Sequence, residues 1–159
     1  MTIEPKILLR LQFLVRVVHK ECKHLSTTDQ RLFGSLFTPE QITRLEEDTD
    51  LAERVEAFVG RFGRLQVTVG DKLLPLLLTA LGEKSSASID NLDRAERLGL
   101  IKSVDEWMTM RNLRNQMVHE YIEDPVILSS ALQTGHAFVQ TLITAANKMI
   151  TETARRGWA

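Results

Sequence analysis

The C-terminal segment carries the strongest folding signal in this sequence, an apolar residue that recurs at alternating steps of four and three. The positions on this stripe are Leu128, Leu132, Gly135, Val139, Leu142, Ala146 and Met149. Such spacing places every member on one face of an α-helix. Asp124 followed by Pro125 favours a helix start, so we expect a helix from there to about Ala154. Since no segment alternates with period two, the sequence predicts no strand.

The N-terminal part of the chain shows the same three-and-four spacing. An apolar stripe predicts a helix over about 3–24, and the polar run Ser26–Asp29 is expected to end it. Residues 29–37 have no clear period and are compatible with a single helical turn. One long helix is therefore expected before residue 30.

The middle of the chain predicts one longer helix that is distorted near its end. Apolar residues share one face over about 50–82, and Pro75 is expected to kink the helix near 71–74 because proline lacks an N–H and crowds the preceding turn. Three glycines inside this helix each cost about 1 kcal/mol relative to alanine. They are Gly60, Gly63 and Gly70. We interpret them as points of close helix packing rather than ligand contact, because no phosphate-loop pattern surrounds them.

Two short helices and one further long helix complete the prediction. The short ones occupy about 38–48, which opens with the capping pattern TPEQ, and 90–98, which follows a loop at 83–88 and ends at Gly99. A capping box of Ser103 and Glu106 begins the further long helix. The predicted fold is an all-α antiparallel bundle of four main helices plus one or two short ones, a single domain over 1–159.

Composition narrows the functional classes. The 159 residues carry a formal net charge of −1, which does not imply a broad basic surface for nonspecific nucleic-acid binding. The single Cys22 cannot form an intrachain disulfide, and the N-terminal residues do not follow the order of a signal peptide, so we expect a cytoplasmic protein. The most apolar run, Leu73–Leu81, is too short to cross a bilayer, and no membrane association is predicted.

Polar groups cluster on the third long helix in the stretch MRNLRNQMVHEY, residues 110–121. Arg114 is followed after four residues by His119 and then, after one more, by Tyr121. On an ideal helix Arg114 and Tyr121 lie on the same side, whereas His119 lies about 140° around the helix axis from Arg114. Asn112, Asn115 and His119 form a second polar face, on which an amide can orient the imidazole, and Arg111 adds a further cation.

These groups suit RNA cleavage without a metal or another cofactor. A neutral imidazole can take the proton of a ribose 2′-hydroxyl, and an arginine can stabilise negative charge on the phosphorus transition state. Tyr121 can stack on a base or donate a hydrogen bond to a phosphate. A helical His with a nearby Arg and Tyr is also typical of an ordinary solvated surface, so spacing alone leaves both readings open. Three arrangements would bring the groups together: the arginine stem wraps toward His119, the helix ends near Val118, or a second copy of the helix completes the site. We favour the last, because two copies packed about a two-fold axis double every functional group in one cleft.

The segment RNQMVHEY, residues 114–121, resembles the signature of the HEPN superfamily, specifically its HepT-like branch. The preceding context, RAERLGLIKSVDEWMTM, adds to the likeness, which covers about 50–154. The resemblance implies a helical bundle that dimerises through its motif helices. It further implies a ribonuclease toxin of a type VII, HepT/MntA-like toxin–antitoxin pair, with Arg114 and His119 catalytic and with Arg111, Asn112 and Asn115 supporting them.

The resemblance also implies a partner. In such pairs the antitoxin is a minimal nucleotidyltransferase that transfers AMP to the motif tyrosine, here Tyr121. A bulky anionic adduct two residues from His119 would exclude RNA by sterics and charge. Some members of the superfamily are instead non-catalytic nucleotide- or substrate-binding partners of a nucleotidyltransferase, and this remains the alternative function.

Three other groups of residues are candidate sites. His19, Cys22 and His24 have ligand-type side chains, but their spacing matches no standard zinc pattern, so we predict no metal site. A possible phosphate-facing stripe consists of Arg54, Arg61 and Arg64. Acidic neighbours dilute that stripe, which favours a solvated face. His136 is predicted to be structural.

Overall fold

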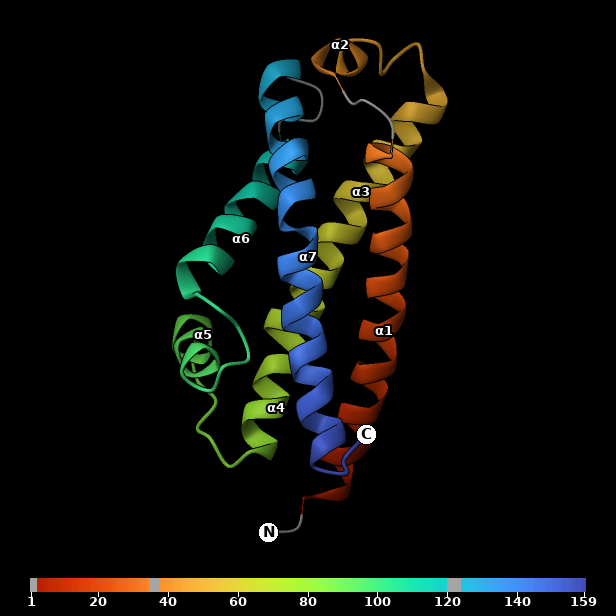
Figure 1. The fold of residues 1–159 in the computed structure, drawn as a ribbon. Coiled ribbons are helices and arrows are strands. Elements are labelled where there is room, and N and C mark those ends of the chain that lie inside the picture. Colours follow the sequence, from red (N-terminus) through yellow and green to blue (C-terminus); the bar gives the residue numbers. More distant parts are fainter. Residues whose placement is uncertain (1–2, 35–37, 120–123) are drawn as a thin grey trace.

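The main helices run alternately up and down, as seen in a computed structural model of the chain that describes residues 3–34, 38–119 and 124–159 (Figure 1). In order, the elements are α1 (Pro5–Phe33), α2 (Pro39–Ile42), α3 (Thr49–Val67), a π-helical turn η1 (Thr68–Leu73), α4 (Leu74–Ala80), α5 (Ser88–Arg97), α6 (Val104–His119) and α7 (Pro125–Arg155). The bundle consists of α1, the continuous rod α3–η1–α4, α6 and α7, with α2 and α5 as short additions. The predicted all-α class is confirmed.

The predicted end of the first helix is wrong, because α1 continues without interruption through Ser26–Asp29 to Phe33. Tertiary contacts explain the continuation. Thr28 is buried and its hydroxyl accepts a hydrogen bond from Arg61 of α3, while Asp29 bonds His136 Nδ1 of α7 at 2.7 Å. These partners fix side chains whose local preference favours a turn, so packing overrides propensity here.

The distortion expected before Pro75 is present as the π-helical turn η1. A proline cannot donate to the ladder, and the wider π turn accommodates the ring while the rod continues into α4. Gly70 lies within η1, where an added Cβ would come 2.8 Å from Cζ2 of Trp107 on α6. The absence of a side chain at Gly70 therefore allows the indole to pack directly on the rod.

The local start and stop signals are mostly confirmed. Asp124 Oδ1 accepts from the backbone N–H of Val126 at 3.0 Å, and Ser103 Oγ accepts from that of Glu106 at 3.2 Å. Gly99 follows α5 with φ 75°, a left-handed conformation that glycine adopts readily. Some bounds differ from expectation: α2 ends already at Ile42 and is followed by turns, α3 begins at Thr49, capped by Asp48, and α5 begins at Ser88 rather than Asp90.

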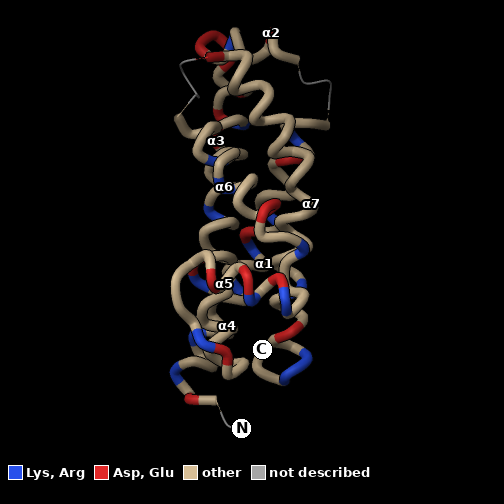
Figure 2. The backbone as a smooth tube through the Cα atoms, turned by 90° about the vertical axis from the view of Figure 1, so that its left-hand side faces the viewer, with Lys and Arg blue, Asp and Glu red and all other residues tan. Residues whose placement is uncertain are grey.

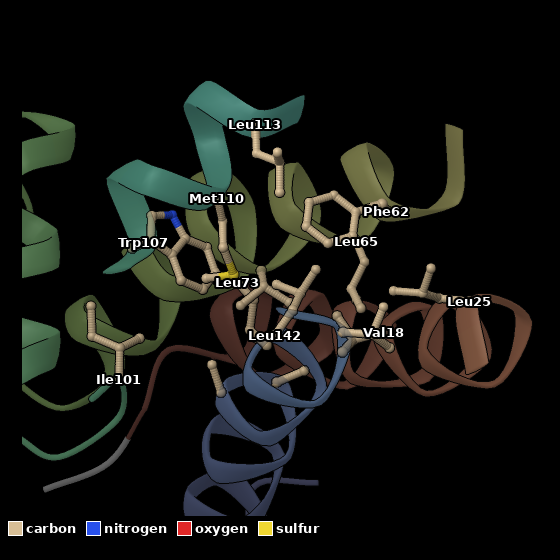
Figure 3. Close-up of a cluster of buried hydrophobic side chains, with 14 of the residues drawn as sticks. Val18, Leu25, Phe62, Leu65, Leu73, Ile101, Trp107, Met110, Leu113 and Leu142 are labelled. Atoms are coloured by element: carbon tan, nitrogen blue, oxygen red, sulfur yellow. The ribbon is translucent and has the colours of Figure 1, made fainter. Parts of the chain in front are cut away.

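The core lies where all four main helices meet, and Figure 3 shows part of it. Side chains from α1, α3, η1, α6 and α7 converge there, among them Val18, Leu65, Leu73, Trp107 and Leu142. Trp107 is 1% exposed and anchors α6 to the bundle. The predicted apolar run at the end of the long helix is also core, since Leu73, Leu74, Leu77 and Leu78 are fully buried.

Within the described residues, one helix, α7, is long and apolar enough by length and composition to cross a membrane. One face of α7 packs into the bundle. Its buried apolar side chains include Leu128, Leu132, Val139, Leu142 and Met149. This face is occupied by the protein's own core.

Candidate functional site

The site predicted from the sequence lies on α6, which packs on α7, α3 and α5 along one side of the bundle (Figure 1). Trp107, Met110, Leu113 and Met117 form its buried face at steps of three and four. The polar residues of the motif therefore fall on the remaining, outward part of the helix. Figure 2 shows acidic and basic residues interspersed on this side of the molecule, without a large region of one sign.

Arg114 is half-buried because its stem lies on Gly63 of α3. A Cβ built on Gly63 would come 2.9 Å from Arg114 Nε and 3.2 Å from Cγ. Among the described residues, no carboxylate forms an ion pair with Arg114. Because Gly63 has no side chain, the stem of Arg114 packs directly against α3. No described residue neutralises the charge of the guanidinium.

His119 is the last residue of α6 and is exposed, as are Asn112 and Asn115. It is five positions after Arg114, which corresponds to about 140° around the helix. Arg114 faces α3, so α6 does not bring the two predicted catalytic side chains onto one face within a single chain. Asn112, Asn115 and His119 do share an outward face, as predicted.

Two exposed apolar groups flank the motif. Val118 is 50% exposed next to His119, and across the segment 120–123 Val126 is 71% exposed and Ile127 is 41% exposed at the start of α7. Tyr121, the predicted modification site, lies outside the described residues. The end of α6 and the start of α7 therefore present apolar side chains close in sequence to the motif.

Arg111 points away from His119 toward the rod and α5. Its Nη2 lies 3.5 Å from Asp71 Oδ1 and 3.3 Å from Ser88 Oγ, and its side chain is 31% exposed. Its position in the sequence placed Arg111 with the motif, but its side chain contacts η1 and α5, which are distant in sequence. Contacts of this kind cannot be predicted from neighbouring residues.

Two arginines of the stripe on α3 donate hydrogen bonds to α1, and the third, Arg64, is exposed. Arg54 Nη1 donates to the carbonyl of Arg31 at 3.4 Å, and Arg61 Nη1 donates to the carbonyl of His24 at 3.3 Å. Arg54 also pairs with Asp50 at 3.0 Å. Arg54 and Arg61 thus link α3 to α1, a long-range contact that the sequence pattern did not predict.

A polar group missed by the sequence analysis lies where α1 meets η1. Thr68 Oγ1 donates to Glu21 Oε1 at 2.9 Å, while Glu21 Oε2 is buried and unpartnered within the described structure. Burial raises the pKa of Glu21 above its usual 4.5, opposed by the Thr68 hydrogen bond and by the charges of Arg64 and Lys72. Burial, aided by Glu21, raises the pKa of the neighbouring Cys22 thiol to about 11. A thiol with so high a pKa is a poor nucleophile at neutral pH.

No three side chains of His, Cys, Asp or Glu converge as metal ligands anywhere in 3–34, 38–119 and 124–159. His136 has a structural role, since it bonds Asp29 and stacks on Phe33 with 4.4 Å between ring centroids. Comparisons of the chain with protein-family models, curated proteins and solved structures find no match.

Proposed function

We propose that this chain is a metal-independent endoribonuclease of the HEPN type, acting as the toxin of a toxin–antitoxin pair. Arg114 and His119 are its catalytic residues. His119 takes the proton of the ribose 2′-hydroxyl as general base, and Arg114 stabilises the charge that develops on the phosphoryl oxygens. Asn112 and Asn115 orient the imidazole from the same face of α6.

The observation that carries the proposal is the seating of Arg114 on Gly63. The stem of Arg114 lies against α3 at Gly63, and no described acidic residue pairs with its guanidinium. Contact with α3 restricts the conformations of the stem and lowers the entropy lost when the guanidinium binds an anion. A positioned guanidinium without a described acidic partner, on the same helix as an exposed imidazole, supports phosphodiester chemistry.

A second copy of the chain completes the active site in this proposal. Within one chain Arg114 and His119 lie on different sides of α6, so their groups meet when two motif helices pack about a two-fold axis. The exposed Val118, Val126 and Ile127 supply apolar area for that contact. The homodimer therefore both buries these side chains and pairs Arg114 of one chain with His119 of the other.

The antitoxin in this proposal is a minimal nucleotidyltransferase that AMPylates Tyr121. Tyr121 is the single tyrosine of the chain, which makes the modification simple to locate. Intact-mass spectrometry after incubation with the partner and ATP is expected to detect added AMP on the wild type and none on Tyr121→Phe. The same addition on both proteins would count against this assignment.

RNA cleavage in excess chelator tests the enzymatic proposal. Wild type is expected to cleave RNA in EDTA, and His119→Ala is expected to be inactive at unchanged folding. His19→Ala, which removes another exposed imidazole on α1, is the matched control and retains activity. Equal cleavage by wild type and His119→Ala would contradict the proposal. Absence of cleavage combined with a stable complex with a nucleotidyltransferase would instead support the non-catalytic partner function.

A further inference from the structure

A polar hollow lies beside Arg111, between the rod, the start of α5 and α6. It is open to solvent and has a volume of about 410 Å³. Its lining residues are Gly70, Asp71, Pro75, Ser86, Ser88, Asn91 and Arg111. The volume is within the range of about 300–1,000 Å³ typical of small-ligand sites. The functional proposal makes no use of this hollow.

The walls of the hollow are held by contacts from several elements. Asn91 is 3% exposed, and its amide binds the backbone of Ser86 in both directions, with Ser86 N–H donating at 2.9 Å and Asn91 Nδ2 donating at 3.1 Å. On the opposite side Gly70 is backed by the Trp107 indole. The floor is therefore preorganised, because its polar groups already have partners and its shape is set by buried side chains.

The hollow is lined by one positive and one negative side chain, Arg111 and Asp71, and this pair favours a neutral ligand. Arg111 and Asp71 lie side by side at 3.5 Å, so a phosphate would be repelled by the carboxylate and a bare cation by the guanidinium. A neutral group that offers an acceptor next to donors can bind both. The Watson–Crick edge of guanine has this arrangement, with O6 for the guanidinium and N1–H and N2–H₂ for the carboxylate.

Arg111, at the wall of the hollow, and the proposed catalytic His119 lie on the same helix, although the Arg111 guanidinium turns toward Asp71 and Ser88. Arg111, Asn115 and His119 follow one another at steps of four, within about 80° of arc on the outward side of α6. Eight residues of helix separate Arg111 from His119, a rise of about 12 Å. An RNA strand lying along this face can present one base to the hollow while a neighbouring phosphate lies at His119.

We infer that this hollow is a nucleobase subsite that selects guanine next to the cleavage position, an inference that rests on the proposed ribonuclease function for its role. Asp71 accepts the two N–H groups of the base, and Arg111 donates to O6. Adenine has only one amino group on that edge and no O6, so it binds less tightly. A site built to hydrogen-bond a ligand rejects analogues that leave its polar groups unpaired.

Titration of the isotope-labelled protein with guanosine tests the subsite without any cleavage step. The indole N–H of Trp107 and the amide of Gly70 are the reporters, and the indole of Trp158, which follows α7 and does not line the hollow, is the internal reference. Guanosine is expected to shift both reporters saturably, and adenosine is expected to bind at least about tenfold more weakly. Asp71→Asn should lose that preference, whereas Asp93→Asn, an exposed carboxylate of α5 outside the lining, should keep it.

The outcomes separate this inference from the function on which it rests. No guanosine response, equal affinity for both nucleosides, or an unchanged preference in Asp71→Asn would overturn the subsite. RNA that is cleaved with the same sequence pattern by wild type and Asp71→Asn would also overturn it while leaving the ribonuclease intact. Selective guanosine binding without RNA cleavage would support the subsite and overturn the ribonuclease proposal.

Discussion

Gly63 on α3 and Arg114 on α6 lie so close that a single added carbon on the glycine would come 2.9 Å from Nε of the arginine. The two residues are distant in sequence, and the contact sets where the guanidinium lies relative to the bundle. A glycine that lowers helix propensity is thus coupled to the residue we propose to be catalytic. A substitution at Gly63 can therefore change activity through Arg114 without an equal change in stability.

Gly63→Ala is expected to reduce RNA cleavage by about a hundredfold while leaving stability within about 1 kcal/mol of wild type. The arginine side chain is flexible, so it can move away from the new methyl group at little cost, and alanine gains helix propensity. The displaced guanidinium no longer stabilises the transition state. Cleavage rates and urea unfolding of the same preparations check both parts.

Gly60→Ala is the matched control for this substitution. A Cβ at Gly60 meets no atom within 4 Å, and the residue lies one turn earlier in the same helix. It should raise the free energy of unfolding by up to about 1 kcal/mol and leave cleavage unchanged. Equal activity of the two alanine variants would contradict the proposed role of the Gly63 contact.

Gly70→Ala is expected to lower the free energy of unfolding by about 1–3 kcal/mol, the usual range for overpacking. The new Cβ would meet Trp107 at 2.8 Å, and this ring is rigid and buried, unlike the arginine at Gly63. Urea denaturation monitored by tryptophan fluorescence measures the loss. Stability equal to wild type would show that α6 can shift away from the rod.

The half-buried Glu21 is expected to make stability depend on pH. Burial raises its pKa in the folded state above the usual 4.5, so the folded protein binds this proton more tightly than the unfolded chain. Below about pH 4.5 the carboxyl is protonated in both states and carries no penalty. As pH rises from there through the raised pKa of the folded state, the native protein must hold a negative charge in a poorly solvated site. The free energy of unfolding therefore falls.

Glu21→Gln removes that penalty while keeping an oxygen that can accept from Thr68. The variant should have a higher melting temperature than wild type at pH 7, and the difference should shrink as pH falls below 4.5. Thermal unfolding of both proteins across this range measures the difference. A constant difference at all pH values, or a less stable variant at pH 7, would contradict the expected linkage.

Helix type and most helix starts could be predicted from the sequence because they depend on nearby residues. The stripe on α7 and the caps at Ser103 and Asp124 need only neighbours three or four positions away. The end of α1 could not be predicted, since Thr28 and Asp29 are held in a helix by Arg61 and His136 from other elements.

The candidate site also has features that the sequence could predict and features that it could not. Spacing was sufficient to group Asn112, Asn115 and His119 on one outward face of α6. It could not reveal that Arg114 lies on Gly63, or that Arg111 joins Asp71 to form the wall of a hollow, because these contacts link segments about 40 or more positions apart. Close packing was predicted for all three glycines, and it is confirmed at Gly63 and Gly70 but wrong at Gly60, where the space is open.

Subunit mixing tests most directly the claim that Arg114 and His119 cleave RNA together across a dimer. Arg114→Ala and His119→Ala are each purified, shown to be folded, and assayed for RNA cleavage in EDTA alone and after being unfolded and refolded together. Each variant alone should be inactive. The mixture should recover activity, because a heterodimer then holds one site with Arg114 from one chain and His119 from the other. Cleavage by either variant at the wild-type rate, or no recovery in a mixture proven to contain heterodimer, would contradict the account.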